Sequence, residues 1–85
     1  MTKYTISPFA KTYNEKGELG HWQFCGEVKV EAGSLEEAVD IATKQVEDNF
    51  KNRGIRVRGV LVDSVIDENM KHTQLTAWDE SGFPI

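Results

Sequence analysis

Residues 34–54 read SLEEAVDIATKQVEDNFKNRG, and this stretch decides the fold. Its apolar side chains recur every three or four positions, which places them on one side of a helix and leaves the other side polar. The apolar stripe consists of Leu35, Ala38, Val39, Ala42, Val46 and Phe50. Ser34 suits the N-cap, Glu37 can complete a capping box, and Gly54 can supply a left-handed stop. The sequence therefore predicts one amphipathic helix.

A strand is predicted directly before this helix. Residues 22–32 alternate between apolar and polar side chains, the period of a half-buried strand, and the alternation puts Trp22 and Phe24 on the inward face. Farther upstream, residues 4–20 combine β-favouring side chains with a glycine-containing turn. Together the two segments predict a hairpin, in which Pro8 suits an edge strand better than a central one.

Two more strands are predicted after the helix. Residues 55–66 read as a strand with a bulge near Gly59, which would switch the face that points inward. Residues 67–70 form a turn, residues 71–78 a last strand, and residues 79–85 a loosely ordered tail.

The order β-β-α-β-β predicts a two-layer α+β domain that occupies residues 1–85, with one helix on one face of an antiparallel or mixed four-stranded sheet. The other sheet face is then solvated, used for binding, or covered by a second copy of the chain. Val60, Val62 and Trp78 are apolar residues that the helix does not account for. A homodimer through the uncovered face would explain them, and a bulge at Gly59 would explain them equally well.

Composition narrows the function classes. The chain has 85 residues, 39% hydrophobic and 28% charged, with a net charge of −4. This balance fits a globular protein and excludes a basic nucleic-acid coat or a disordered acidic tail. No segment reaches the roughly 18 uncharged residues of a membrane helix. The first residues, MTKYTISPFAK, lack the apolar region of a signal peptide, so we expect a cytoplasmic protein without membrane contact.

Catalytic and metal-binding patterns are not evident. Cys25 and His21 are four residues apart on a predicted strand, about 13 Å, which is too far for a thiolate–imidazolium pair. His72 is the only other histidine, and no spaced cluster of metal ligands or phosphate-binding glycine loop occurs. We therefore expect no enzyme activity, no cofactor and no metal site.

Four positive charges lie within eight residues, and we take them as candidate binding residues: Lys51, Arg53, Arg56 and Arg58. On a regular strand Arg56 and Arg58 would point the same way, towards phosphates or acidic side chains. Alternatively, the arginines pair with strand acids such as Glu27 and Glu31. A nucleic-acid interpretation lacks the usual aromatic stacking platform: Trp22 and Trp78 are candidates, but Trp22 has the inward phase.

A second candidate surface is acidic. The solvent side of the predicted helix carries the carboxylates Glu36, Asp40 and Glu47. Regularly spaced carboxylates can imitate a phosphate backbone and occupy a nucleic-acid channel of another protein. Their alternative role is to keep an exposed helix face soluble.

The strand, the cap and the first helical turns carry a recognisable signature. It is the run Val28-Lys29-Val30-Glu31-Ala32-Gly33-Ser34-Leu35-Glu36-Glu37-Ala38, followed by Ala42. This run, about 15 of the 85 residues, resembles the V-x-V-x-A-x-S-x-E-E-A signature of short phage and mobile-element α+β proteins, which include anti-CRISPR-like inhibitors. The resemblance implies a compact, cofactor-free binding protein and assigns no binding residue.

The leading hypothesis is a small non-enzymatic interaction protein, encoded by a phage or mobile element, that inhibits a larger protein or nucleoprotein complex in the host cytoplasm. The alternative is a nucleic-acid-binding module that uses the basic residues from Lys51 to Arg58. A third hypothesis is an enzyme subunit whose active site is shared across a dimer interface.

Overall fold

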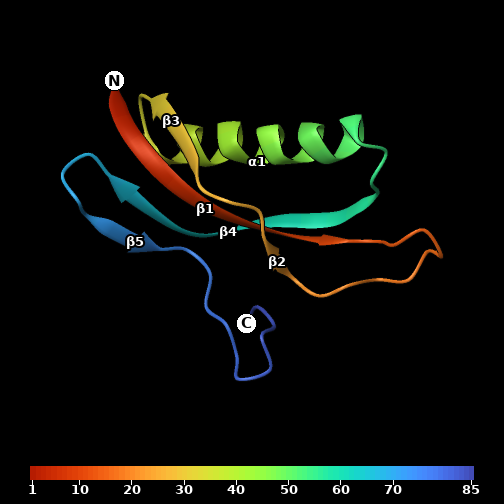
Figure 1. Ribbon diagram of the computed structural model, residues 1–85. Coiled ribbons are helices and arrows are strands. Elements are labelled where there is room, and N and C mark those ends of the chain that lie inside the picture. The colour runs from red at the N-terminus through yellow and green to blue at the C-terminus, as the bar shows by residue number, and fades with distance from the viewer.

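A computed structural model describes all residues 1–85. One helix, α1 (Leu35–Asn52), packs on one face of an antiparallel sheet, which confirms the predicted α+β class (Figure 1). The strands are β1 (Thr2–Thr12), β2 (Gln23–Phe24), β3 (Val28–Ala32), β4 (Val57–Asp67) and β5 (His72–Gln74). The sheet has five strands rather than four because the segment before the helix is divided into β2 and β3.

The long strand β1 lies in the middle of the sheet. It pairs with β4 on one side and with β2 and β3, one after the other, on its other side, while β5 extends the sheet beyond β4. All these pairs are antiparallel, so β3 and β4 run parallel to each other with β1 between them. Helix α1 makes the crossover from β3 to β4.

Both ends of α1 follow the local sequence signals. Ser34 Oγ accepts a hydrogen bond from the Glu37 backbone N–H at 3.1 Å, and Glu37 Oε2 accepts one from the Gly33 N–H at 3.3 Å. At the other end, Gly54 has φ 71° and its N–H bonds to the Lys51 carbonyl, while the Ile55 N–H reaches the carbonyl of Phe50. These two bonds form a Schellman motif, as the glycine predicts.

The core lies between α1 and the three strands that it crosses. It is built from Ile6, Val30, Ala32, Ala38, Ala42, Val62 and Val65. The two helix positions are alanines, which lets the backbone of α1 approach the sheet closely. Val62 belongs to this core, so it is not an apolar residue left on the uncovered face.

The segment before the helix changes face at Gly26. Phe24 pairs with Phe9, whereas Val28 pairs with Ile6, so four steps along this segment match three along β1. Gly26 has φ 87°, a conformation that glycine adopts without strain. The extra residue puts the Phe24 ring against Phe9, while Val28 still packs against the core. The expectation that Trp22, Phe24 and the later apolar residues share one inward face is therefore wrong.

Strand β4 contains two further irregularities. Arg58 has no partner on β1, which confirms a bulge beside Gly59, and Asp63 is a second unpaired residue that the sequence did not predict. Pro8 lies in the central strand, contrary to expectation, at the register shift next to Asp63. A proline lacks the N–H that a regular ladder would use, so a bulge is a position where a central strand tolerates it.

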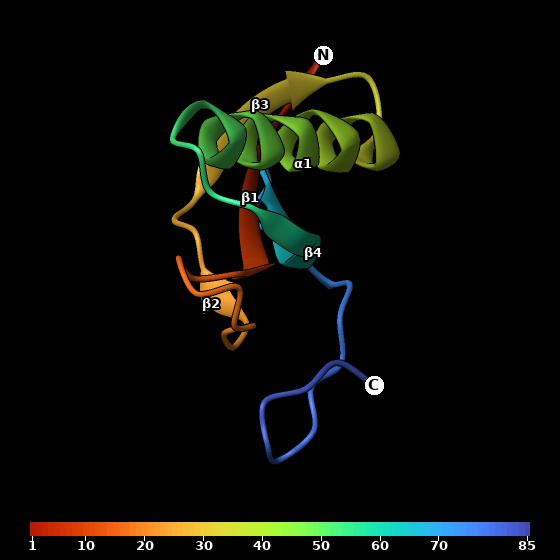
Figure 2. The ribbon, with the colours of Figure 1, turned by 90° about the vertical axis from the view of Figure 1, so that its right-hand side faces the viewer.

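The C-terminal segment lies below the sheet, on the side opposite α1 (Figure 1, Figure 2). Asp79 Oδ1 accepts hydrogen bonds from the backbone N–H groups of Ser81 and Phe83, both at 2.9 Å. The Ile85 N–H bonds to the carbonyl of Ala77 at 2.8 Å. Where the sequence led us to expect a loosely ordered tail, these bonds define a closed loop.

Candidate aromatic binding surface

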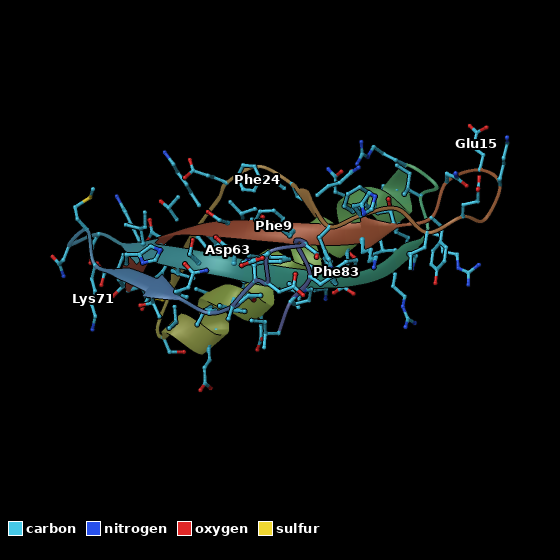
Figure 3. All side chains as sticks on the ribbon, turned by 90° about the horizontal axis from the view of Figure 1, so that it is seen from below. Phe9, Glu15, Phe24, Asp63, Lys71 and Phe83 are labelled. Atoms are coloured by element: carbon cyan, nitrogen blue, oxygen red, sulfur yellow. The ribbon has the colours of Figure 1, made fainter.

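The sheet face that α1 does not cover carries a group of aromatic side chains. We call it the aromatic surface, and it consists of Phe9, Trp22, Phe24, Trp78 and Phe83. Figure 3 views this side from below and labels Phe9, Phe24 and Phe83. The rings come from β1, from the residues around β2 and from the C-terminal segment, so segments distant in sequence assemble the surface.

Four of these rings form one connected cluster, and Phe83 is linked to them through Lys11, which lies near both the Phe83 and the Trp22 rings. The centroid of Phe9 lies 5.5 Å from that of Phe24 and 5.1 Å from that of Trp78, in tilted arrangements. The Trp22 and Trp78 rings meet edge to face at 6.3 Å. These separations lie in the range that aromatic pairs favour, so each ring helps to fix its neighbours.

Part of the aromatic surface is open to solvent. Phe24 is 53% exposed and Phe83 is 44% exposed, while Trp22 and Trp78 are half-buried. Aromatic groups gathered on one exposed face mark a binding surface more often than aromatic groups scattered singly do. These two phenylalanines are the parts of the aromatic surface that another molecule would cover first.

A positive charge lies at the edge of the aromatic surface. Lys11 Nζ is 6.0 Å from the centroid of the Trp22 ring and 5.3 Å from that of Phe83. Both distances allow a cation–π attraction. Lys11 therefore gives the apolar surface a cationic border.

Asp63 fixes the C-terminal segment against the sheet. Trp78 Nε1 and Gln74 Nε2 each donate to Asp63 Oδ1 at 2.7 Å. Burial raises the pKa of Asp63, but hydrogen bonds from Trp78, Gln74 and Ser64, together with the charge of His72, outweigh burial and hold the pKa below its usual value. The carboxylate is thus ionised at neutral pH and can accept both bonds.

Cys25 lies in the break between β2 and β3 and lines a groove with Phe50 and Arg53 at the C-terminal end of α1. Its thiol Sγ donates to the Gln23 carbonyl at 3.5 Å. Burial raises the pKa of the thiol, and this outweighs the lowering by the Ala10 backbone and the charge of Arg53. The thiol is therefore protonated at neutral pH, which makes it a poor nucleophile.

The structure brings three of the four basic residues together at the C-terminal end of α1. Arg53 and Arg56 line one groove with the loop after β1, and Lys51 lines a neighbouring groove with Arg56. The Arg56 guanidinium lies 4.5 Å from the centroid of the Tyr13 ring, and that of Arg53 lies 4.9 Å from the centroid of Phe50. These stacked guanidinium groups are held in place and are exposed.

Arg58 is exposed, but its place in the strand differs from the expectation. Arg56 precedes β4, and Arg58 is the bulged residue, so the two are not successive outward positions of a regular strand. The alternative pairing of Arg58 with Glu31 is also wrong. Glu31 pairs with Lys3 at the opposite end of β1 from Arg58, about 27 Å away along the strand.

The acidic residues Glu36, Asp40 and Glu47 are all exposed on α1 and span about 16 Å along its axis. Lys44 lies between Asp40 and Glu47 at helical spacing, so it interrupts the row of negative charge. The acidic side chains do not adjoin the aromatic surface, because α1 and the aromatic rings occupy opposite faces of the sheet.

Sequence reasoning missed the aromatic surface. It extended one alternating pattern across residues 22–32 and therefore assigned Trp22 and Phe24 to the core. It placed Phe83 in a loosely ordered tail. A signal was present in Gly26, since an isolated glycine inside a strand pattern often marks a bulge.

No protein-family model, curated protein or solved structure matches this chain. No helix combines the length and the apolar character that crossing a membrane requires. The fold gathers no group of three or more His, Cys, Asp or Glu side chains that could hold a metal ion.

Proposed function

We propose that this protein is a small non-enzymatic interaction protein that binds a larger protein through the aromatic surface. The observation that carries the proposal is the exposure of Phe24 and Phe83 beside the half-buried Trp22 and Trp78 on the face without a helix. Aromatic residues are enriched in the centres of protein interfaces, where they supply much of the binding energy. Inhibition of a larger complex, as for a phage-encoded protein in a host cell, is part of this proposal.

The charge distribution around the aromatic surface supports a protein partner. Lys11 borders it on one side, while Asp79 and Glu80 belong to the C-terminal loop that supplies Phe83. An apolar centre with a rim of both charge signs is the usual anatomy of a protein interface. A nucleic-acid surface carries predominantly positive charge.

Site-specific photo-crosslinking in the source cell tests this proposal. A photoreactive amino acid at position 24 or 83 should give one covalent adduct with a larger protein, and one at Asp40 on α1 should not. The double substitution Phe24→Ser and Phe83→Ser should abolish capture of that same protein. The matched charge variants Arg53→Glu with Arg56→Glu, and Glu36→Lys with Asp40→Lys, should retain it. Loss of capture only in a charge pair would reject the aromatic surface as the interface.

A second candidate function is single-stranded nucleic-acid binding, and a specific observation favours it. Trp22 lies on the uncovered face with Phe9 and Trp78, next to Lys11, although the alternating pattern gave it the inward phase. These rings would supply a stacking platform. Bases stack on such rings while cations contact the phosphates. Arg53 and Arg56 would extend the cationic path beyond the end of β1.

Tryptophan fluorescence distinguishes this candidate from the first. Oligodeoxythymidine or oligouridine at low salt should quench the emission, and affinity should fall steeply as salt is added. The pair Arg53→Gln and Arg56→Gln should flatten the dependence on salt. An unchanged emission at low salt would eliminate nucleic-acid binding and leave the protein-binding proposal untouched.

A further inference from the structure

The outer edge of β3 has no strand beside it. β3 pairs with β1 along one edge, from Val28 opposite Ile6 to Ala32 opposite Thr2, and with no other strand. Figure 1 shows β3 at the margin of the sheet. About half of the backbone N–H and C=O groups of a strand in this position point outward, where they can pair with a strand of another chain.

The exposed side chains of β3 are complementary in charge to those of a second, antiparallel copy of β3. Lys29 and Glu31 are exposed and lie symmetrically about Val30, which is buried. Edge strands that resist pairing often carry lysines, which repel a second copy. Here the two charges have opposite signs. Antiparallel pairing of two β3 strands centred on Val30 would put Lys29 opposite Glu31 of the partner subunit. The two-fold symmetry of the dimer would create two such pairs.

Neighbouring registers do not offer the same match. A two-fold axis perpendicular to the sheet pairs only residues that share a face, so each symmetric register is centred on a residue. The registers that pair three or more residues of β3 are those centred on Lys29, Val30 or Glu31. Centring on Lys29 brings two lysines together, and centring on Glu31 brings two glutamates together. Of these three registers, only the one centred on Val30 pairs opposite charges, and on the helix side it places Val28 opposite Ala32 of the partner subunit.

We propose that two copies of this chain associate through antiparallel pairing of their β3 edges, centred on Val30. The pairing joins two sheets into one and keeps both α1 helices on the same face. Five residues of strand span about 17 Å, a contact smaller than that of a standard interface, so the dimer is a reversible one. The aromatic surfaces stay free, which separates this dimer from one formed through the uncovered face.

Charge exchange at two positions tests the register. Sedimentation velocity of the wild-type chain from micromolar to millimolar concentration should show a monomer–dimer equilibrium. Lys29→Glu and Glu31→Lys should each weaken self-association by about tenfold or more, because two attractive pairs become repulsive. An equimolar mixture of the two variants should form a heterodimer, and the double variant carrying both changes should dimerise like the wild type.

The outcomes separate the edge from other interfaces. The double variant Phe24→Ser and Phe83→Ser should dimerise like the wild type. Glu31→Lys also faces Lys3 on β1, so circular dichroism must show that it is folded. If it is not, Lys29→Ala and Glu31→Ala should each weaken the dimer without adding a charge. A wild-type chain that is monomeric at millimolar concentration, a mixture that stays monomeric, or a dimer lost only in the phenylalanine variant would overturn the proposal.

Discussion

Asp63 Oδ1 accepts a hydrogen bond from Trp78 Nε1 over 2.7 Å, and this bond ties the C-terminal segment to the sheet. Asp63 is the bulged residue of β4, so no residue of β1 lies opposite it. Its backbone carbonyl accepts the N–H groups of Leu75 at 2.9 Å and Thr76 at 3.2 Å. One irregular residue of the sheet therefore positions the segment that supplies Trp78 to the aromatic surface.

The substitution Asp63→Ala should destabilise the protein by about 1–3 kcal/mol, because it removes a charged acceptor and leaves the Trp78 N–H without its partner. Urea denaturation measures the loss. The tryptophan emission of the folded variant should also shift to longer wavelength as Trp78 becomes more hydrated. Asp63→Asn keeps one oxygen acceptor and should lose less stability.

Asp48→Ala on the exposed side of α1 is the matched control. It removes an equal charge away from the C-terminal segment and should change stability by less than about 0.5 kcal/mol. Equal losses for Asp48→Ala and Asp63→Ala, or an unchanged emission in the Asp63 variant, would contradict an anchoring role.

The stabilisation by Asp63 should depend on pH. Its pKa is lower in the folded chain than the usual aspartate value of about 3.9, so the unfolded chain binds the proton more readily. The contribution is complete above pH about 4 and is lost as pH falls through the folded pKa. Stability curves of the wild type and Asp63→Asn, measured from pH 7 to acid, should converge at the acid end. A difference that stays constant with pH would argue against the ionised carboxylate as the acceptor.

The helix could be predicted from sequence because its determinants are local. Ser34, Glu37 and Gly54 act within a few residues of one another, and each takes the expected role. The sheet face that a strand residue occupies is not determined locally, because it depends on how many residues each strand contributes between two pairing points. Gly26 and Asp63 each add one residue to a strand, and an added residue reverses the face of everything beyond it.

The aromatic surface follows from the same two irregularities. The break at Gly26 turns Phe24 to the uncovered face, and the bulge at Asp63 provides the acceptor that holds Trp78 there. Phe83 joins them through a loop whose Asp79 and Gly82 are ordinary turn residues, so this loop could have been predicted from composition. Its position beneath the sheet could not, because it depends on Asp63.

Cys25 should react slowly with iodoacetamide in the folded protein. Burial raises the pKa of its thiol, so the reactive thiolate is scarcer than in a free cysteine, whose pKa is about 8.5. The rate against pH should therefore have its midpoint above that of the same chain in urea. A folded-state midpoint below the urea value would indicate an activated thiol and would revive the catalytic hypothesis.

Gly26→Ala should lower the free energy of unfolding by about 1–2 kcal/mol, although there is room for the added methyl group. The φ of 87° is unfavourable for an L-residue, while a Cβ at this position would meet no atom within 4 Å, so the expected loss is backbone strain alone. Gly59→Ala is the matched control, because Gly59 lacks a positive φ and its Cβ would lie 3.7 Å from the Trp22 ring, an ordinary contact. Denaturant unfolding should show a change below about 0.5 kcal/mol for Gly59→Ala. If Gly26→Ala were equally neutral, the left-handed residue would not be what turns Phe24 to the uncovered face, and the aromatic surface would need another origin.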